Sequence, residues 1–166
     1  MRAKFTISYG MALIALIAAA CGGSTASTGV SSPPPVGASP SPSPAATGAT
    51  IAVATNGKLG QILVDGKGIT LYLFVKDTDT QSTCYTSCAT VWPPVLTAGA
   101  PQAGTGVTAS LVGTTTRTDG KIEVTYAGHP LYYFIQDKQP GDTTGQGVDG
   151  FGALWWVLTP AGAAIH

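Results

Sequence analysis

The feature that most constrains the fold is an internal repeat with a period of 60 residues. The segment Gly60–Asp77 aligns without a gap on the segment Gly120–Asp137, and eight of the eighteen positions are identical. Self-similarity at a fixed period is typical of a chain built from two copies of one supersecondary unit. The sequence therefore predicts a folded part with two equivalent halves.

Each copy has the composition of β-strands. Runs of β-branched and aromatic residues are separated by turn sequences such as Asp65-Gly66-Lys67-Gly68 and Ala127-Gly128-His129-Pro130. No long segment shows a helical period. We expect three strands in each half: Thr50–Thr55, Ile62–Val64 and Leu71–Val75, then Val112–Thr118, Ile122–Tyr126 and Leu131–Ile135. The predicted fold is all-β: an antiparallel sandwich or open barrel built from two three-strand meanders.

The N-terminus has the pattern of a bacterial export signal. Arg2 and Lys4 precede the apolar run Met11–Ala20, which is shorter than the roughly 20 residues that span a bilayer. Ala18-Ala19-Ala20-Cys21 resembles the lipobox of bacterial lipoproteins, although the usual Leu is Ala18 here. This resemblance implies lipidation of Cys21 and anchoring at the membrane outside the cytoplasm. The alternative is ordinary signal cleavage beside an unrelated cysteine.

A linker separates this signal from the repeats. Residues 22–50 contain no charged residue, and six of the twelve prolines lie between Pro33 and Pro44. Such a composition does not bury enough apolar surface to fold and acts as a tether. The predicted organisation is a signal at 1–20, the lipidated cysteine and linker at 21–49, and a β domain at 50–166, with repeats at about 50–97 and 107–163.

Charge is sparse beyond Cys21, where six Lys and Arg residues stand against eight Asp and Glu residues. Nucleic-acid binding needs clustered basic residues that neutralise phosphates, and no such cluster is present. We therefore expect no nucleic-acid partner, a membrane contact through the lipid anchor alone, and a monomeric protein.

Cys84 and Cys88 are spaced four residues apart. In an extended strand their Cα atoms would lie about 13 Å apart, whereas a disulfide needs less than about 7 Å. A disulfide therefore requires a helical turn, which we expect within Thr83–Val91 with Ser82 as its N-cap. The alternatives are a redox pair or a metal site, but the spacing is not Cys-x-x-Cys and no further Cys or His lies nearby.

The repeated aromatic and acidic residues form the candidate binding set. Tyr and Phe lie two residues apart in each copy and so share one face of a strand, and Asp follows Phe by three residues. In one interpretation the aromatic rings pack the core and each Asp ends its strand by accepting local backbone hydrogen bonds. In the other, the carboxylates and hydroxyls line one site between the repeats. The residues are Tyr72, Phe74, Asp77, Tyr132, Phe134 and Asp137.

The same motifs resemble a known family. Tyr72-x-Phe74-x-x-Asp77 and Tyr132-x-Phe134-x-x-Asp137 are similar to the tandem Tyr-x-(Phe/Trp/Tyr)-x-x-Asp motif of bacterial secreted-repeat lipoproteins of unknown function. Further matching segments are Cys84-YTS-Cys88, Trp92-Pro93-Pro94, Gly128-x-Pro130-Leu131-Tyr132 and Trp155-Trp156. The resemblance implies an extracytoplasmic, repeat-built domain and implies no activity.

No sequence motif predicts catalysis or a cofactor. The serines of the folded part lie in no nucleophile elbow, and phosphate-binding loops are missing. The aspartates offer ligands for a hard cation without forming a calcium loop, so a metal is neither predicted nor excluded. Trp155 and Trp156 face opposite ways on a strand, so at least one of them is expected in the core. Exposed aromatic side chains would suit the binding of sugars.

We therefore expect a non-catalytic binding module of the cell envelope that recognises a small molecule, an ion or a wall component between its repeats. Two alternatives belong to other classes. One is an enzyme or redox accessory that uses Asp77 and Asp137 as acid and base, or Cys84 and Cys88 as an exchangeable disulfide. The other is a structural surface spacer.

Overall fold

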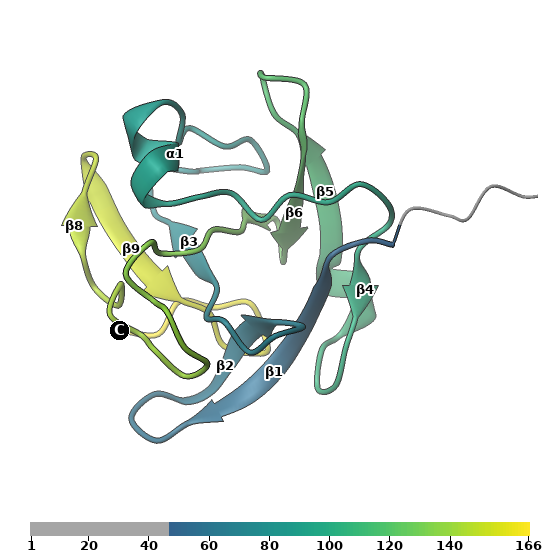
Figure 1. Cartoon of the computed structure of the whole chain (residues 1–166), viewed down its shortest axis with the longest axis vertical. Coiled ribbons are helices and arrows are strands. Elements are labelled where there is room, and N and C mark those ends of the chain that lie inside the picture. The colour runs from purple at the N-terminus through teal and green to yellow at the C-terminus, as the bar shows by residue number, and fades with distance from the viewer. Residues whose placement is uncertain (1–46) are drawn as a thin grey trace, which may run out of the picture. The chain divides into compact units, whose positions relative to one another are not determined.

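The structure is a computed structural model that describes residues 47–166, so the signal, Cys21 and most of the linker lie outside the described residues (Figure 1). Short strands dominate the described part, which confirms the all-β prediction. The strands are β1 (Thr50–Asn56), β2 (Gly60–Asp65), β3 (Tyr72–Phe74), β4 (Gln102–Ala103), β5 (Val112–Thr116), β6 (Ile122–Tyr126), β7 (His129–Pro130), β8 (Asp149–Gly150) and β9 (Ala153–Val157). One α-helix, α1 (Ser87–Val91), and one 3-10 turn (Ala109–Leu111) accompany them.

The strands form three small sheets with the orders β2-β1-β4, β3-β9-β8 and β5-β6-β7. Neighbouring strands are antiparallel except β1 and β4, which are parallel. A backbone hydrogen bond from Leu63 of β2 to Leu158, directly after β9, links two of the sheets, and one from Val124 of β6 to Val95 holds the segment after α1. The described strands do not close into a barrel, and β4 and β5 each end a sheet.

The hairpins of the two repeats differ by one residue. In the first repeat Leu63 accepts the backbone hydrogen bond of Leu71, whereas in the second Val124 accepts that of Leu131. The structural equivalence is therefore offset by 61 residues before the turn and by 60 after it, because the second turn is one residue shorter. The gapless alignment is wrong for the strand before the turn. Ile122, which it paired with the buried Ile62, is 38% exposed.

Backbone pairing links the two repeats in both directions. β9 of the second repeat pairs with β3 of the first, with Val157 opposite Tyr72. In the reciprocal position Pro94 of the first repeat forms a bridge with Tyr132 of the second. Tyr72 and Tyr132 also exchange backbone hydrogen bonds of 2.9 and 3.0 Å, which places a pseudo-twofold axis between them. The sheet β3-β9-β8 is therefore built from strands of both repeats.

A stack of four aromatic rings joins the two repeats. Trp92 and Trp155 are parallel, with 4.0 Å between ring centroids and 3° between planes. Phe74 stacks on the outer face of Trp155 and Phe134 on that of Trp92, at 4.0 and 4.2 Å. All four side chains are buried. The prediction that the motif aromatics pack the core is confirmed, and Trp155 rather than Trp156 is the fully buried tryptophan of its pair.

The disulfide between Cys84 and Cys88 is confirmed, with 5.2 Å between the Cα atoms. The helical turn is shorter than expected because α1 starts only at Ser87, after Thr86 with a φ of 50°. Ser82 is therefore not the N-cap, and that prediction is wrong. The helix ends before Trp92, as expected for the residue that precedes a proline.

Candidate functional site

The repeated tyrosines and aspartates bond across the two repeats. The hydroxyl of Tyr72 donates a hydrogen bond of 2.5 Å to Oδ2 of Asp137, and the hydroxyl of Tyr132 donates one of 2.5 Å to Oδ2 of Asp77. Sequence analysis placed these residues on corresponding strands but did not foresee the exchange of partners. Each motif is therefore completed only by the other copy.

The second oxygen of each carboxylate holds a loop of its own repeat. Oδ1 of Asp77 accepts hydrogen bonds from the backbone amide and the hydroxyl of Thr83, at 2.8 and 2.7 Å. Oδ1 of Asp137 accepts the same two bonds from Thr144, at 2.9 and 2.5 Å. The expectation of local backbone bonds is met in part, but sequence analysis missed both threonines. A threonine six or seven residues after each Asp is the sequence signal that was available.

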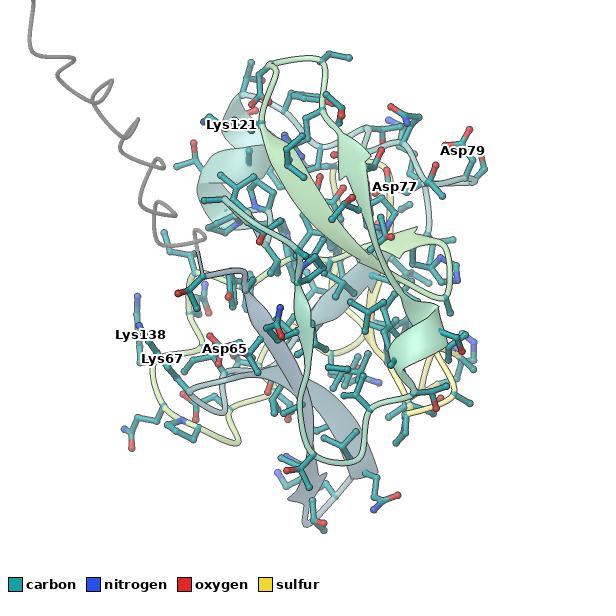
Figure 2. All side chains as sticks on the ribbon, turned by 90° about the vertical axis from the view of Figure 1, so that its right-hand side faces the viewer. Asp65, Lys67, Asp77, Asp79, Lys121 and Lys138 are labelled. Atoms are coloured by element: carbon teal, nitrogen blue, oxygen red, sulfur yellow. A yellow bond between two sulfur atoms is a disulfide. The ribbon has the colours of Figure 1, made fainter. Side chains whose placement is uncertain are left out.

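Burial raises the pKa of the two tyrosine hydroxyls. Asp77 lies among the strands, whereas Lys67, Lys121 and Lys138 are exposed (Figure 2). Burial, followed by the hydrogen bond to Asp137, raises the pKa of Tyr72 well above its ordinary value. For Tyr132, burial is again the largest cause, followed by the charge of Glu123 and the bond to Asp77, so its pKa is raised as well. Both hydroxyls therefore remain protonated donors rather than bases.

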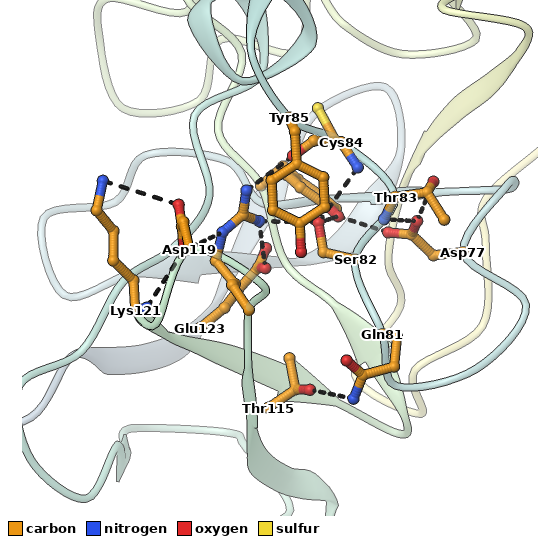
Figure 3. Close-up of polar contacts among 12 residues, drawn as sticks. Asp77, Gln81, Ser82, Thr83, Cys84, Tyr85, Thr115, Asp119, Lys121 and Glu123 are labelled. Atoms are coloured by element: carbon orange, nitrogen blue, oxygen red, sulfur yellow. Dashed lines mark hydrogen bonds and ion pairs between the residues drawn. The ribbon is translucent and has the colours of Figure 1, made fainter.

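A polar network on one side breaks the symmetry of the repeats. Nη1 of Arg117 donates to Oε2 of Glu123 at 2.7 Å and to the hydroxyl of Ser82 at 2.8 Å, and Nη2 donates to the Cys84 carbonyl at 2.8 Å. The cluster continues from Ser82 to Asp77 through the hydroxyl of Tyr132, which lies within hydrogen-bond distance of both (Figure 3). The network ties the disulfide loop of the first repeat to the β5–β6 hairpin of the second.

Both charged groups of this network are withdrawn from solvent. Arg117 is 3% exposed and Glu123 is 0% exposed. Burial raises the pKa of the Glu123 carboxyl to about 7, although the bond to Arg117 opposes this shift. Burial lowers the pKa of Arg117, but the hydrogen bond and charge of Glu123 raise it by more, so the guanidinium stays charged. Sequence analysis assigned no role to either residue.

The six predicted binding residues are all buried. Their hydroxyls and carboxylates therefore do not line one solvent-accessible site. The structure instead uses most of their polar atoms internally. Among the described residues no group of three His, Cys, Asp or Glu side chains is arranged to hold a metal ion. In residues 47–166 no helix is long and apolar enough to cross a membrane.

One pocket does lie where the two repeats meet. It has a volume of about 270 Å³, and the first repeat lines it with Phe74, Val75 and Asp77 among other residues. The second repeat contributes His129 and Trp156, and the C-terminal segment adds His166. The rings of Trp156 and His166 meet edge to face at 4.7 Å. We call this the inter-repeat pocket.

The fold and these contacts define a class of protein: a β domain of two interlocked repeats, in which the tyrosine of each repeat bonds the aspartate of the other. Residues 53–96 and 113–159 match the family described as "Secreted repeat of unknown function". These matches cover more than half of the chain, and the protein belongs to that family. No curated protein and no solved structure matches the chain.

Proposed function

We propose that the protein is a lipid-anchored, non-catalytic binding module of the cell envelope, whose ligand occupies the inter-repeat pocket. The family is described as secreted, which supports an extracytoplasmic location. The pattern of the signal and of Cys21 supports the anchor. The uncharged, proline-rich composition of residues 22–49 is typical of a tether between an anchor and a domain.

The observation that carries this proposal is the composition of the inter-repeat pocket. Trp156 and the two imidazoles of His129 and His166 combine flat apolar surface with hydrogen-bonding groups. A volume of about 270 Å³ lies just below the usual range for ligand sites and suits a single ring. Such walls fit a sugar unit of a wall glycan, which presents a flat apolar face and polar edges.

The packing beneath the pocket holds its wall in one conformation, which favours a role in binding over a role in conformational change. Phe74 lines the pocket and also belongs to the four-ring stack. A wall fixed by close packing loses little conformational entropy when the ligand arrives. The hydrogen bonds that Asp77 accepts from Thr83 and Tyr132 also fix its carboxylate.

The experiment is a chemical-shift titration of the chain from Cys21 onward, carrying Cys21→Ser, with soluble wall-derived oligosaccharides. We expect shifts at His129 and Trp156, and at least tenfold weaker binding after Trp156→Ala. Val75 and Ile135 occupy corresponding positions and are 49% and 44% exposed, but Val75 lines the pocket. Val75→Ala should weaken binding and Ile135→Ala should not. Equal effects of these two changes, or no shift at millimolar sugar, would exclude the proposal.

The redox alternative makes a different prediction. An exchangeable disulfide is accessible to an attacking thiolate, whereas Cys84 and Cys88 are both buried. Trapping of free thiols in the native protein under mild reductant distinguishes the two functions. Rapid labelling of Cys84 or Cys88 would favour the redox accessory over the binding module.

A further inference from the structure

A second cavity adjoins the inter-repeat pocket. It has a volume of about 310 Å³ and lies between the loop that follows Asp77 and the turn between β6 and β7. We call it the loop cavity, and its lining residues are Thr78, Asp79, Thr80, Ala127, Gly128 and His129. His129 also lines the inter-repeat pocket, and the loop continues directly from Val75 and Asp77, which line that pocket too. The two cavities therefore meet at His129.

The pseudo-twofold axis relates the loop cavity to a space that is closed. In that space the loop after Asp137 lies against the turn between β2 and β3, so that a Cβ atom on Gly68 would be 3.1 Å from Cβ of Pro140. Gly128 corresponds to Gly68, with a φ of 87° against 86°, yet a Cβ atom on Gly128 would meet nothing within 4 Å. The loop cavity is therefore specific to one side of the domain and is not a general consequence of the repeated fold.

Two differences in sequence accompany this opening. On the closed side the hydroxyl of Thr70 donates a hydrogen bond of 2.5 Å to the carbonyl of Asp142, which ties the loop to the other repeat. Pro130 takes the place of Thr70 on the open side, and its side chain has no donor for such a bond. The loop on the open side is also one residue shorter, because the threonine that bonds the aspartate lies six residues after Asp77 and seven after Asp137.

The lining of the loop cavity determines what it can hold. Its side chains include two threonine hydroxyls and the carboxylate of Asp79, but neither Lys nor Arg. Oδ1 of Asp79 accepts the backbone amide of Gln81 at 2.6 Å, which orients the carboxylate and leaves Oδ2 to accept from a ligand. Hydroxyl and carboxylate oxygens accept from hydroxyl and amide donors, and the carboxylate repels an anion. The cavity therefore suits a unit that is rich in such donors and carries no negative charge.

We infer that the ligand of the inter-repeat pocket is a carbohydrate of at least two linked units, whose second unit lies in the loop cavity and donates to Asp79. This inference rests on the proposed function and adds the length and the polarity of the ligand. Each cavity alone is close to the lower limit of the usual volume of ligand sites, whereas the two together lie within that range. His129 contacts both units at the junction.

The test compares N-acetylglucosamine with its β-1,4-linked dimer, both uncharged, by chemical-shift titration of the chain from Cys21 onward with Cys21→Ser. The monosaccharide should shift the indole signal of Trp156. The dimer should shift the same signal and also the backbone amides of residues 78–80. It should bind at least about fivefold more tightly than the monosaccharide, the ratio expected for one added hydrogen bond.

Variants of the loop test the second unit separately. Asp79→Asn keeps an acceptor for the amide of Gln81 but removes the charge and one acceptor, so the advantage of the dimer should fall below about twofold. Asp149→Asn is the matched control, because Asp149 is exposed on β8 and lines neither cavity, and it should leave the advantage unchanged. Thr80→Trp places a large side chain at an exposed position of the loop cavity and should also abolish the advantage.

Failure of this inference differs from failure of the proposed function. If both sugars shift Trp156 and bind equally well, or if the dimer leaves residues 78–80 unshifted, the second unit has no site and the inference alone is overturned. Equal effects of Asp79→Asn and Asp149→Asn would overturn it as well. If neither sugar shifts Trp156 at millimolar concentration, the proposed function and the inference fall together.

Discussion

Glu123 occupies the position in the second repeat that Ile62 occupies in the first. Both residues lie one position before the strand residue that accepts the hydrogen bond from Leu71 or Leu131, and both are buried. The two repeats thus share the same backbone hydrogen-bond pattern. At this position the first repeat carries an aliphatic side chain and the second a carboxylate. The carboxylate is accommodated by Arg117, which reaches it from the adjacent hairpin end.

The buried Glu123 carboxyl predicts an unusual dependence of the free energy of unfolding on pH. The pKa of Glu123 in the folded protein is about 7, above its ordinary value of 4.5. The folded state therefore holds this proton more tightly than the unfolded state, and the resulting stabilisation is complete below pH 4.5 and lost as the pH rises through 7. Relative to Glu123→Gln, the free energy of unfolding of the wild type should fall by up to about 1.4 kcal/mol per pH unit in this window.

Urea unfolding at half-unit intervals from pH 4 to 8 measures this difference. At any one pH the wild type and Glu123→Gln also differ in free energy of unfolding because the variant alters the pairing of Arg117. The test therefore follows how this difference changes with pH. A difference that is constant from pH 4.5 to 7.5 would show that Glu123 does not titrate in this range.

The exchanged tyrosine and aspartate pairs predict a specific pattern of energetic coupling. Tyr72→Phe leaves a buried carboxylate oxygen of Asp137 without its donor and should destabilise the domain by about 1–3 kcal/mol. In a double-mutant cycle, Tyr72→Phe and Asp137→Asn should couple by at least about 0.5 kcal/mol.

Asp77 provides the matched control within the same repeat. Tyr72 and Asp77 share no hydrogen bond with each other, so Tyr72→Phe and Asp77→Asn should be additive to within about 0.5 kcal/mol. Coupling between Tyr72 and Asp77 that exceeded the coupling between Tyr72 and Asp137 would contradict the exchange of partners.

Gly145 is predicted to be intolerant of any side chain. A Cβ atom there would lie 2.8 Å from Cη2 of Trp92 and 3.0 Å from Cε1 of Tyr72, two fully buried side chains of the core. Gly145→Ala should therefore cost about 1–3 kcal/mol through overpacking. Gly57 meets nothing within 4 Å, so Gly57→Ala should leave the midpoint of denaturant unfolding unchanged or raise it. Similar losses for both variants would indicate a general effect of removing glycine.

The disulfide should contribute a modest amount to stability. A ring closed by Cys84 and Cys88 spans few residues, and the loop-entropy relation gives about 2 kcal/mol. Replacing both cysteines with alanine should lower the melting temperature by several degrees for a domain of this size. Reductant should then have no further effect on the variant. An unchanged melting temperature would mean that the contacts of Arg117 with this loop suffice to hold it.

The sequence by itself determined the features that depend on local chemistry. β-branched and aromatic runs gave five of the six expected strands within a few residues, while the segment Leu131–Ile135 contributes only the bridges of Tyr132 rather than a regular strand. The spacing of Cys84 and Cys88 was sufficient to require a turn, since an extended chain cannot bring them together. Eight identities at a fixed period were sufficient to reveal the two halves.

Only the tertiary structure decided which groups meet. Tyr72 bonds Asp137 rather than Asp77, and Val157 rather than Pro94 lies beside Tyr72, because the closing strands cross between repeats. Ser82, expected to cap a helix, instead accepts from Arg117, which lies 35 residues away. Such pairings depend on packing between distant segments, whose free energy does not appear in local propensity or period. The sequence therefore specified the two units, and the packing of one against the other specified their partners.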